Sequence, residues 1–460
     1  MFFENSIVAI ADYILFGVCV FILLGSIFIS IRMRFVQLRF IPTLFKMLWN
    51  SLFNNSQQET GHTILPHKAL FTAMSTTLGI STIVSPVIAI SLGGPGALLG
   101  YLLTCFFGSA ATYAEVNLCI QHRKKLANGT IMGGPMQYLQ HLLSPAVAKW
   151  YAMGCFILMA AWSSAQANQL AAILNSPLLE SYSIPTALSG VLIAVLVILT
   201  LLGGIKRISA FSSKIVPIMF VLYLGSCLWI ILYNTDKFFE IWQMIFASAM
   251  SPYALASGTV VGGIVTSLRW GMFKGIQTCE AGIGTQTIPH SMAETNDPVS
   301  QGTLAMLSTY TAGLIAFLSG FVALITETWL DPELPLGISM VAASFEHYFS
   351  TFGIAIVVIS TFLFAFGTIL GNSFNGSQCF NYLTNNKKTY LYIAGTAVMI
   401  FIGSISEVKT VWSLIDIVLA AIAIPHMAAL MLYAYKNPSP VIVKQVVTVP
   451  EETEYAESQA

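Results

Sequence analysis

The sequence predicts an all-α polytopic membrane protein with 11 transmembrane helices. Apolar residues make up 56% of the chain and charged residues only 9%, whereas about a quarter of a soluble domain is charged. Threading the apolar segments alternately through a membrane leaves all but two of the 20 Lys and Arg residues, Lys237 and Lys409, on one side. Because basic residues collect in cytoplasmic loops, we expect an inner (plasma) membrane protein with its N-terminus outside and its C-terminus in the cytoplasm.

Most apolar segments are long enough to cross the hydrocarbon core. Residues 338–371 exceed one crossing, so we expect a tilted helix or a lateral lead-in there. Residues 35–53 mix aromatic, aliphatic and basic side chains, which predicts a helix lying in the cytoplasmic interface, and residues 436–460 predict a disordered tail. The predicted crossings are 12–31, 69–92, 97–120, 148–172, 184–203, 213–233, 241–268, 301–326, 338–371, 389–405 and 411–435.

The segment 69–92 contains a run of hydroxyl residues around a glycine, followed by a proline. Glycine eases departure from helical geometry, and Pro86 cannot donate to the carbonyl four residues before it. An unwound segment whose loose backbone groups bind an ion or a polar substrate is one interpretation. A small-residue face that packs against another helix, with hydroxyls bonded to their own backbone, is the alternative. The run comprises Thr76, Thr77, Gly79, Ser81, Thr82 and Ser85.

The segment 241–268 is disturbed in the same way, because Pro252, Gly258, Gly262 and Gly263 interrupt it. It lies five helices after the first interrupted segment. Two interrupted helices at matching places predict an inverted repeat with a binding site near the midplane. Residues 1–68 would then hold an extra helix and the interfacial helix, and 69–435 a ten-helix core with halves of about 69–233 and 241–435.

Few charges lie inside the apolar segments. Glu115, Asp416 and His426 are functional candidates, although groups close to a helix end can instead reach the interface. The chain has no HExxH, no GxSxG and no paired carboxylates at helical spacing, so we do not expect an enzyme. The net charge of zero gives no basic face for nucleic acid, and no cofactor is expected.

Several stretches in order resemble the alanine or glycine:cation symporters, also called the sodium:alanine symporter family. The resemblance covers about residues 12–435, and the ordered set is far more specific than any one motif. The stretches are FILLGSIFISIRMRFVQLR (21–39), SLGGPGALLGYLLTCFFGSAATYAE (91–115), GTIMGGPMQYL (129–139), AQANQLAAIL (165–174), GGIKRIS (203–209), KGIQTCEAGIGTQTIPHSMAETNDPVSQG (274–302), FAFGTILG (364–371) and VWSLIDIVLAAIAIPHMAALM (411–431).

The resemblance implies the five-plus-five inverted-repeat fold of the amino acid–polyamine–organocation type. It also implies import of alanine or glycine with Na⁺. Ion ligands would be Thr368 and the backbone of 69–92 near Gly79 and Thr82. Substrate-binding positions would be Thr76, Gly79, Ser81, Thr82, Asn168, Gln169, Gly258 and Gly262.

The chain departs from the family pattern at these positions. The family's GTGN is Gly79-Ile80-Ser81-Thr82, and one hydroxyl position beside Thr368 is Gly367. Its SNEAGLG is TCEAGIG here, and its WxYYGE is NSFNGS at 372–377, which we expect after the ninth helix. Proton coupling or weak coupling is therefore an alternative to Na⁺ coupling. A non-transporting amino-acid sensor is a further alternative.

Overall fold

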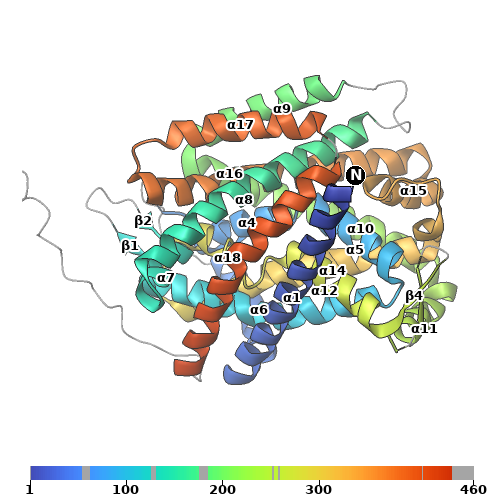
Figure 1. Ribbon diagram of the computed structural model, residues 1–460, viewed down its shortest axis with the longest axis horizontal. Coiled ribbons are helices and arrows are strands. Elements are labelled where there is room, and N and C mark those ends of the chain that lie inside the picture. Colours follow the sequence, from blue (N-terminus) through green and yellow to red (C-terminus); the bar gives the residue numbers. More distant parts are fainter. Residues whose placement is uncertain are drawn as a thin grey trace, which may run out of the picture.

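The computed structural model is a bundle of helices with two short antiparallel strand pairs (Figure 1). It describes residues 2–53, 63–125, 131–175, 185–250, 253–256, 259–406 and 408–437. The first elements are α1 (Phe2–Arg32), α2 (Val36–Arg39), α3 (Ile41–Phe53), α4 (Pro66–Thr77), α5 (Ile80–Gly93), α6 (Ala97–His122), β1 (Lys124–Lys125), β2 (Ile131–Met132), α7 (Pro135–Leu142), α8 (Pro145–Leu174), α9 (Thr186–Leu201) and α10 (Gly204–Tyr233). The rest are α11 (Thr235–Met250), β3 (Tyr253–Ala256), β4 (Thr259–Gly262), α12 (Gly263–Cys279), α13 (Thr287–Ser291), α14 (Pro298–Thr326), η2 (Thr328–Leu330), α15 (Ile338–Phe349), α16 (Thr351–Thr384), α17 (Thr389–Ile405) and α18 (Val408–Lys436).

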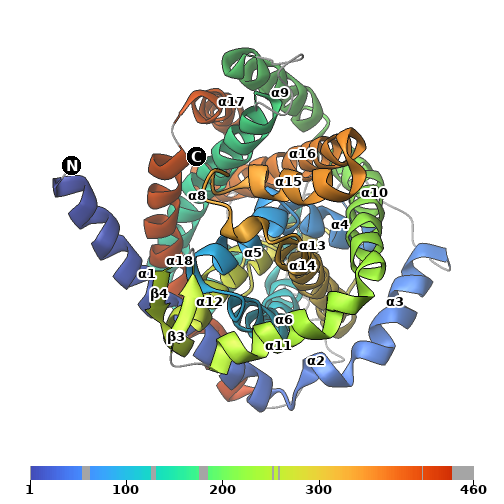
Figure 2. The same ribbon diagram turned by 90° about the vertical axis from the view of Figure 1, so that its right-hand side faces the viewer.

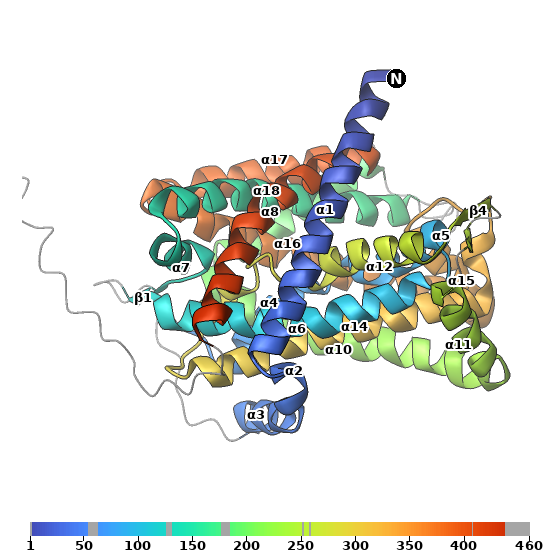
Figure 3. The same ribbon diagram turned by 60° about the horizontal axis from the view of Figure 1, so that its bottom comes forward.

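Six helices of the described chain are long and apolar enough to cross a membrane, namely α6, α8, α10, α14, α16 and α18. The bent pair α4 and α5 adds a seventh span, and α9, α17 and the Phe16–Arg32 part of α1 are shorter apolar helices. α17 packs along both α8 and α9, and α1 packs along α18 and α6 (Figures 2 and 3). The multi-pass helical class expected from composition is confirmed.

The first interrupted helix is the bent pair α4 and α5, whose axes differ by 42°. At the joint Leu78 leaves helical geometry (φ −87°, ψ 67°) and Gly79 is extended (φ −95°, ψ −176°). Pro86 lies inside α5 without ending it. The interruption predicted near Gly79 is confirmed. It leaves carbonyls at the end of α4 and amides at the start of α5 without helical partners.

The predicted helix over 241–268 is wrong. α11 ends at Met250, and the pair β3–β4 separates it from α12, with Gly262 opposite Tyr253. Pro252 and Gly258 lie outside the described residues. Gly262 therefore lies in a strand and Gly263 begins α12, and neither interrupts a helix.

The second interrupted helix is instead formed by α12 and α13, with its break at residues 280–286. Glu280, Gly282 and Gly284 all adopt positive φ there (51°, 82° and 96°), a region that favours glycine. Every residue from Cys279 to Ala293 is buried. The sequence CEAGIGTQ is polar enough to resemble a cytoplasmic loop, but the structure encloses it within the bundle.

The two interrupted helices run antiparallel and lie against each other. α5 packs along α12, and α4 packs along α13, so the first part of one pairs with the second part of the other. Figure 2 shows α5, α12 and α13 near the middle of the bundle, with α6, α14 and α16 around them. Ser85 of α5 joins the pair through a hydrogen bond with Thr278 of α12, 3.0 Å between the two hydroxyl oxygens.

The long segment predicted at 338–371 is two helices. α15 ends at Phe349, Ser350 adopts φ 50°, and α16 then runs from Thr351 to Thr384. The separate helix expected before this crossing is α15, which confirms that alternative. α16 extends beyond the predicted end at residue 371, so NSFNGS (372–377) lies inside this helix rather than after it.

The interfacial helix expected at 35–53 corresponds to α2 and α3. α3 exposes Phe45 (63%), Trp49 (62%) and Phe53 (66%), and it lies at the outside of the bundle (Figures 2 and 3). An exposed aromatic face on an amphipathic helix suits the boundary between lipid and water. Residues 54–62, between α3 and α4, and the tail from residue 438 lie outside the described residues.

Candidate functional site

The first break is where α5, α8 and α16 meet. The N–H of Ile80, the first residue of α5, donates to Oε1 of Gln166 on α8 at 2.9 Å. A methyl group at Gly79 would lie 2.9 Å from Oγ1 of Thr368 and 3.1 Å from the Gln166 amide atoms. Because a side chain there would displace one of these groups, glycine is what lets polar side chains approach the backbone closely.

Thr368 connects α16 to the end of α4. Its hydroxyl donates to the carbonyl of Ser75 at 2.9 Å. α4 ends two residues after Ser75, so this carbonyl is among the last four, which lack an intrahelical donor. Hydroxyl and carbonyl oxygens at an unwound helix end are groups that can coordinate Na⁺. This pair lies where the family resemblance implies an ion position, at Thr368 and the backbone near Gly79.

The hydroxyl groups near the first break bond to the backbone. Thr76 donates to Ala73 O at 2.7 Å, and Thr82 donates to Thr77 O at 2.9 Å. Ser81 is half-buried at the start of α5. These hydroxyl groups therefore bond to the backbone of their own segment, as one of the two interpretations of the sequence expected. Each hydroxyl oxygen still has lone pairs that can accept a hydrogen bond from a ligand.

Asn168 and Gln169 do not contact Gly79. The Asn168 amide donates to the carbonyls of Gly403 and Ser406 at the end of α17, each at 2.8 Å. Gln169 is half-buried, and its Oε1 lies 3.5 Å from an ideal Cβ at Gly337, just before α15. Gln166, in the same QANQ motif, is the residue that reaches the break. The sequence identified the right motif, but it does not show which residue of that motif faces Gly79, because this depends on how α8 is rotated about its axis.

The second break is fixed by buried polar side chains. Glu115 of α6 accepts a hydrogen bond from the N–H of Gly282 through Oε1. Nδ1 of His426 on α18 lies 2.7 Å from the Gly282 carbonyl. Both the N–H and the carbonyl of Gly282 are therefore hydrogen-bonded. Glu280 accepts from the hydroxyl of Thr285 across the break. Glu115 and His426 thus have structural partners that their sequence positions did not reveal.

Three further helices contact the second break. The hydroxyl of Tyr151 on α8 donates to Ile283 O at 2.7 Å, and the amide of Asn375 on α16 donates to Thr285 O at 3.2 Å. Ile22 of α1 lies 3.2 Å from an ideal Cβ at Gly282. Asp416 lies elsewhere and accepts from Gln277 at 2.6 Å. α16 therefore contacts both breaks, through Thr368 and through Asn375.

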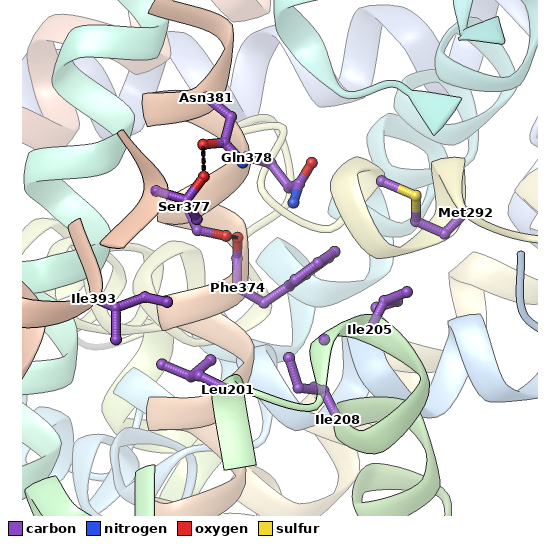
Figure 4. A pocket seen from close by; sticks show the side chains of 11 residues that line it. Leu201, Ile205, Ile208, Met292, Phe374, Ser377, Gln378, Asn381 and Ile393 are labelled. Atoms are coloured by element: carbon purple, nitrogen blue, oxygen red, sulfur yellow. Dashed lines mark hydrogen bonds between the residues drawn. The ribbon is translucent and has the colours of Figure 1, made fainter. Parts of the chain in front are cut away.

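A cavity of about 200 Å³ lies at one end of the bundle, between the start of α10 and the second half of α16 (Figure 4). Its lining includes Ile205, Met292, Phe374 and Ser377. These α16 residues project from a different face of the helix than Thr368 and Asn375. The cavity therefore opens beside the helix that joins the two breaks, not between them.

Comparisons with known proteins agree with this architecture. Residues 1–440 match the sodium:alanine symporter family. An uncharacterized transporter of Haemophilus influenzae is 32% identical over 93% of both chains. The sodium/alanine symporter AgcS of Methanococcus maripaludis is 32% identical over 89% of this chain and 90% of its own.

Two solved structures share the fold at low identity. One is a Na⁺-coupled sialic acid symporter in an outward-open state, with a TM-score of 0.53, 15% identity, and coverage of 88% of this chain and 82% of that one. The other is MhsT in complex with L-phenylalanine, with a TM-score of 0.54, 12% identity, and coverage of 82% and 90%. Both have the inverted-repeat transporter fold, which the antiparallel interrupted helices lead one to expect. The chain belongs to the sodium:alanine symporter family, which comprises cation-coupled amino-acid transporters of the membrane and not enzymes.

Proposed function

We propose that the protein imports a small neutral amino acid of the alanine or glycine class together with Na⁺, by alternating access. The observation that carries this proposal is the antiparallel pair of interrupted helices whose breaks are both contacted by α16, at Ser75 O and at Thr285 O. The name of the Methanococcus maripaludis relative, a sodium/alanine symporter, supports the same substrate and ion.

The half-helix ends supply charge complementary to a zwitterion. The start of α5, at Ile80, has the positive end of a helix dipole and would attract the substrate carboxylate, while the carbonyls at the end of α4 would attract the ammonium group and the cation. Ion and substrate would favour each other's binding because each offsets the other's charge. Rocking of one part of the bundle would then open the site to the other side.

Uptake by purified protein in proteoliposomes tests the proposal. Radiolabelled alanine or glycine should accumulate when Na⁺ is higher outside, and much less when the Na⁺ gradient is absent. Failure to take up alanine, glycine or serine under any cation gradient would reject the substrate class. Saturable binding without uptake would favour an amino-acid sensor instead.

Proton coupling is the second candidate, and Glu115 favours it. This carboxylate is fully buried beside the second break, and its Oε2 has no hydrogen-bond partner in the part of the chain that the structure describes. A buried carboxyl group at a moving joint is a common position for a proton carrier. Accumulation driven by a pH gradient without Na⁺ would support this alternative over Na⁺ coupling.

We further propose eleven crossings with the N-terminus outside and the C-terminus in the cytoplasm of an inner-membrane protein. Residues 1–68 would form the extra helix and the interfacial helix, 69–435 the transporter core, and 436–460 the tail. The halves would be about 69–233 and 241–435, with α12 and α13 together as the first crossing of the second half. Labelling of single cysteines introduced into the polar connections from either side tests this orientation.

Replacing Thr368 with valine should raise the Na⁺ concentration needed for half-maximal uptake by about tenfold. The substitution keeps the side-chain shape but removes the hydroxyl that bonds to Ser75 O, and a lost ligand of this kind corresponds to about 1.4 kcal/mol. Thr384→Val is a matched control, because its hydroxyl bonds within α16 to Phe380 O. An unchanged Na⁺ dependence in Thr368→Val would remove this residue from the ion site.

The ends of α4 and α13 that we place on the cytoplasmic side are tied together. A parallel β-bridge joins Ile64 to Ala293, with Ile64 N donating to Met292 O at 3.0 Å and Glu294 N donating to Ile64 O at 2.8 Å. Arg123 donates to Ser291 O at 2.7 Å and to Ala293 O at 2.6 Å. These contacts close the bundle at this end.

Arg123→Gln should shift the protein towards an inward-open state. The variant loses the charge-assisted bonds that hold the segment after α13 against α6. We expect maleimide labelling of a cysteine introduced at Gln378, in the cavity lining, to become severalfold faster. Lys125→Gln, at an exposed residue of β1, is the matched control, and equal labelling in the two variants would contradict the role given to Arg123.

A further inference from the structure

One face of α16 extends from the first break to the second. Residues three or four apart on a helix share a face, and Thr368, Asn372 and Asn375 have this spacing. Thr368 is bonded to Ser75 O at the end of α4, and Asn375 is bonded to Thr285 O in the second break. Asn372 stands between Thr368 and Asn375 on the same face, at a position of α16 between the two breaks.

Asn372 has unused hydrogen-bonding groups at this position. It is completely buried, and neither its Oδ1 nor its Nδ2 has a partner among the residues described here. Oδ1 of the buried Asn375, one turn further on, is likewise without one within the described ranges. Buried polar atoms are almost always bonded, so an amide NH₂ group and two carbonyl oxygens within one turn on one face of α16 indicate that a ligand completes them.

Resting on the transport function proposed above, we propose that Asn372 and Asn375 form a subsite for the side chain of the transported amino acid, and that this subsite favours a side-chain amide over an apolar side chain of similar size. A primary amide matches these atoms in both directions. Its NH₂ group would donate to the Oδ1 atoms, and its carbonyl would accept from Nδ2 of Asn372. A hydroxyl group could satisfy part of the set, whereas the methyl group of alanine satisfies none of it.

Charged side chains fit this subsite less well. A carboxylate brings acceptors only, and it would face the two Oδ1 oxygens. An ammonium group brings donors only and would leave Nδ2 of Asn372 without an acceptor. Alanine and glycine would still bind through their shared carboxylate and ammonium groups. The subsite therefore selects among neutral amino acids instead of replacing the main site at the breaks.

Glycine positions on α16 fit this arrangement. A methyl group added at Gly371 would clash with Cγ2 of Thr76, so α16 packs closely against α4 immediately beside Asn372. A methyl group at Gly376 would clash with the hydroxyl of Tyr392 on another side of the helix. α16 is thus held tightly on both flanks, and the orientation of Asn372 is fixed by the packing of its helix.

Competition for uptake in proteoliposomes tests the subsite. The inhibition of radiolabelled alanine uptake is measured with L-glutamine and L-asparagine, and with L-methionine and L-leucine as apolar side chains of similar size. For the unmodified protein, the stronger competitor of L-glutamine and L-asparagine should half-inhibit alanine uptake at a concentration about tenfold lower than L-methionine or L-leucine does. An apolar side chain would leave the buried polar groups of the subsite unpaired. Equal competition by amide and apolar side chains would overturn the subsite, and it would point to ordered water as the partner of Asn372.

Asn372→Leu should reduce the amide-to-apolar ratio to about one, because leucine has a similar size and no hydrogen-bonding atom. The matched control is Thr384→Val, further along α16, whose hydroxyl bonds to Phe380 O within the helix, and it should keep the ratio of the unmodified protein. Gel filtration checks that each variant is folded, and Asn372→Ala replaces the leucine variant if that one aggregates. A variant that transports alanine and still prefers amides overturns the assignment, whereas unmodified protein that transports no amino acid rejects the proposed function itself.

Discussion

Gly79→Leu is expected to lower amino-acid uptake at least 100-fold. Already the first carbon of any side chain would lie 2.9 Å from Oγ1 of Thr368 and 3.1 Å from the Gln166 amide. A branched side chain would also fill the space next to the amide of Ile80 at the start of α5. Uptake of alanine in proteoliposomes, normalised to the amount of folded protein, measures the loss.

Two variants show whether the effect belongs to this position. Gly225→Leu is the matched control, because nothing lies within 4 Å of an ideal Cβ there and uptake should be unchanged. Gly79→Ala should be less damaging than Gly79→Leu, since the ends of Thr368 and Gln166 can move by a few tenths of an ångström. If Gly79→Leu transports as well as Gly225→Leu, the first break is not the substrate site.

Glu115→Leu is expected to destabilise the protein by about 2 kcal/mol, because it leaves the N–H of Gly282 buried without its acceptor. The other bonds of the break, from His426 and Tyr151, remain and do not replace that acceptor. Thermal unfolding of the purified protein in detergent measures the change. The same substitution at the exposed Glu346 of α15 is the control and should leave the unfolding temperature unchanged.

Glu115→Gln separates stability from transport at this residue. Glutamine keeps an oxygen that can accept from Gly282 N, so the unfolding temperature should stay close to that of the unmodified protein. If uptake driven by a pH gradient is lost in this variant while stability is kept, Glu115 carries a proton. An unfolding temperature equally unaffected by leucine and glutamine would show that the Glu115–Gly282 bond does not stabilise the break.

The first break could be predicted because its signals are local. Gly79 within a run of hydroxyl residues weakens a helix whatever its surroundings, and the structure interrupts the helix there. The apolar segments that correspond to α6, α8, α14 and α17 were also predictable, since lipid imposes one length and one composition on a crossing.

The second break could not be predicted, because its signals conflict with those of a crossing. Residues 280–286 are polar, and polarity inside a membrane protein resembles a loop until the partners of each group are known. Those partners, Glu115, Tyr151 and His426, lie far away in the chain. The glycines at 258 and 262 gave the stronger local signal, but only the tertiary structure shows that α12 begins after them.

The choice between Gln166 and Gln169 was similarly out of reach. Both belong to one motif on α8, and they differ by three residues, a rotation of about 60° on a helix with 3.6 residues per turn. Which of them faces Gly79 depends on how α8 packs against α16 and α17. Resemblance to a family transfers a motif reliably, but it transfers the orientation of single side chains less well.

The contact between α1 and the second break gives this N-terminal helix a structural role. α1 buries Ile22 (1% exposed) next to Gly282 and exposes Leu24 (58%) on its outer side. Hydrocarbon tails cannot hydrogen-bond to an irregular backbone, so a stretch such as 280–286 needs insulation from them. α1 separates this backbone from the lipid. A transporter of this type without such a helix would need another protein surface, such as a neighbouring subunit, to cover the same side of the second break.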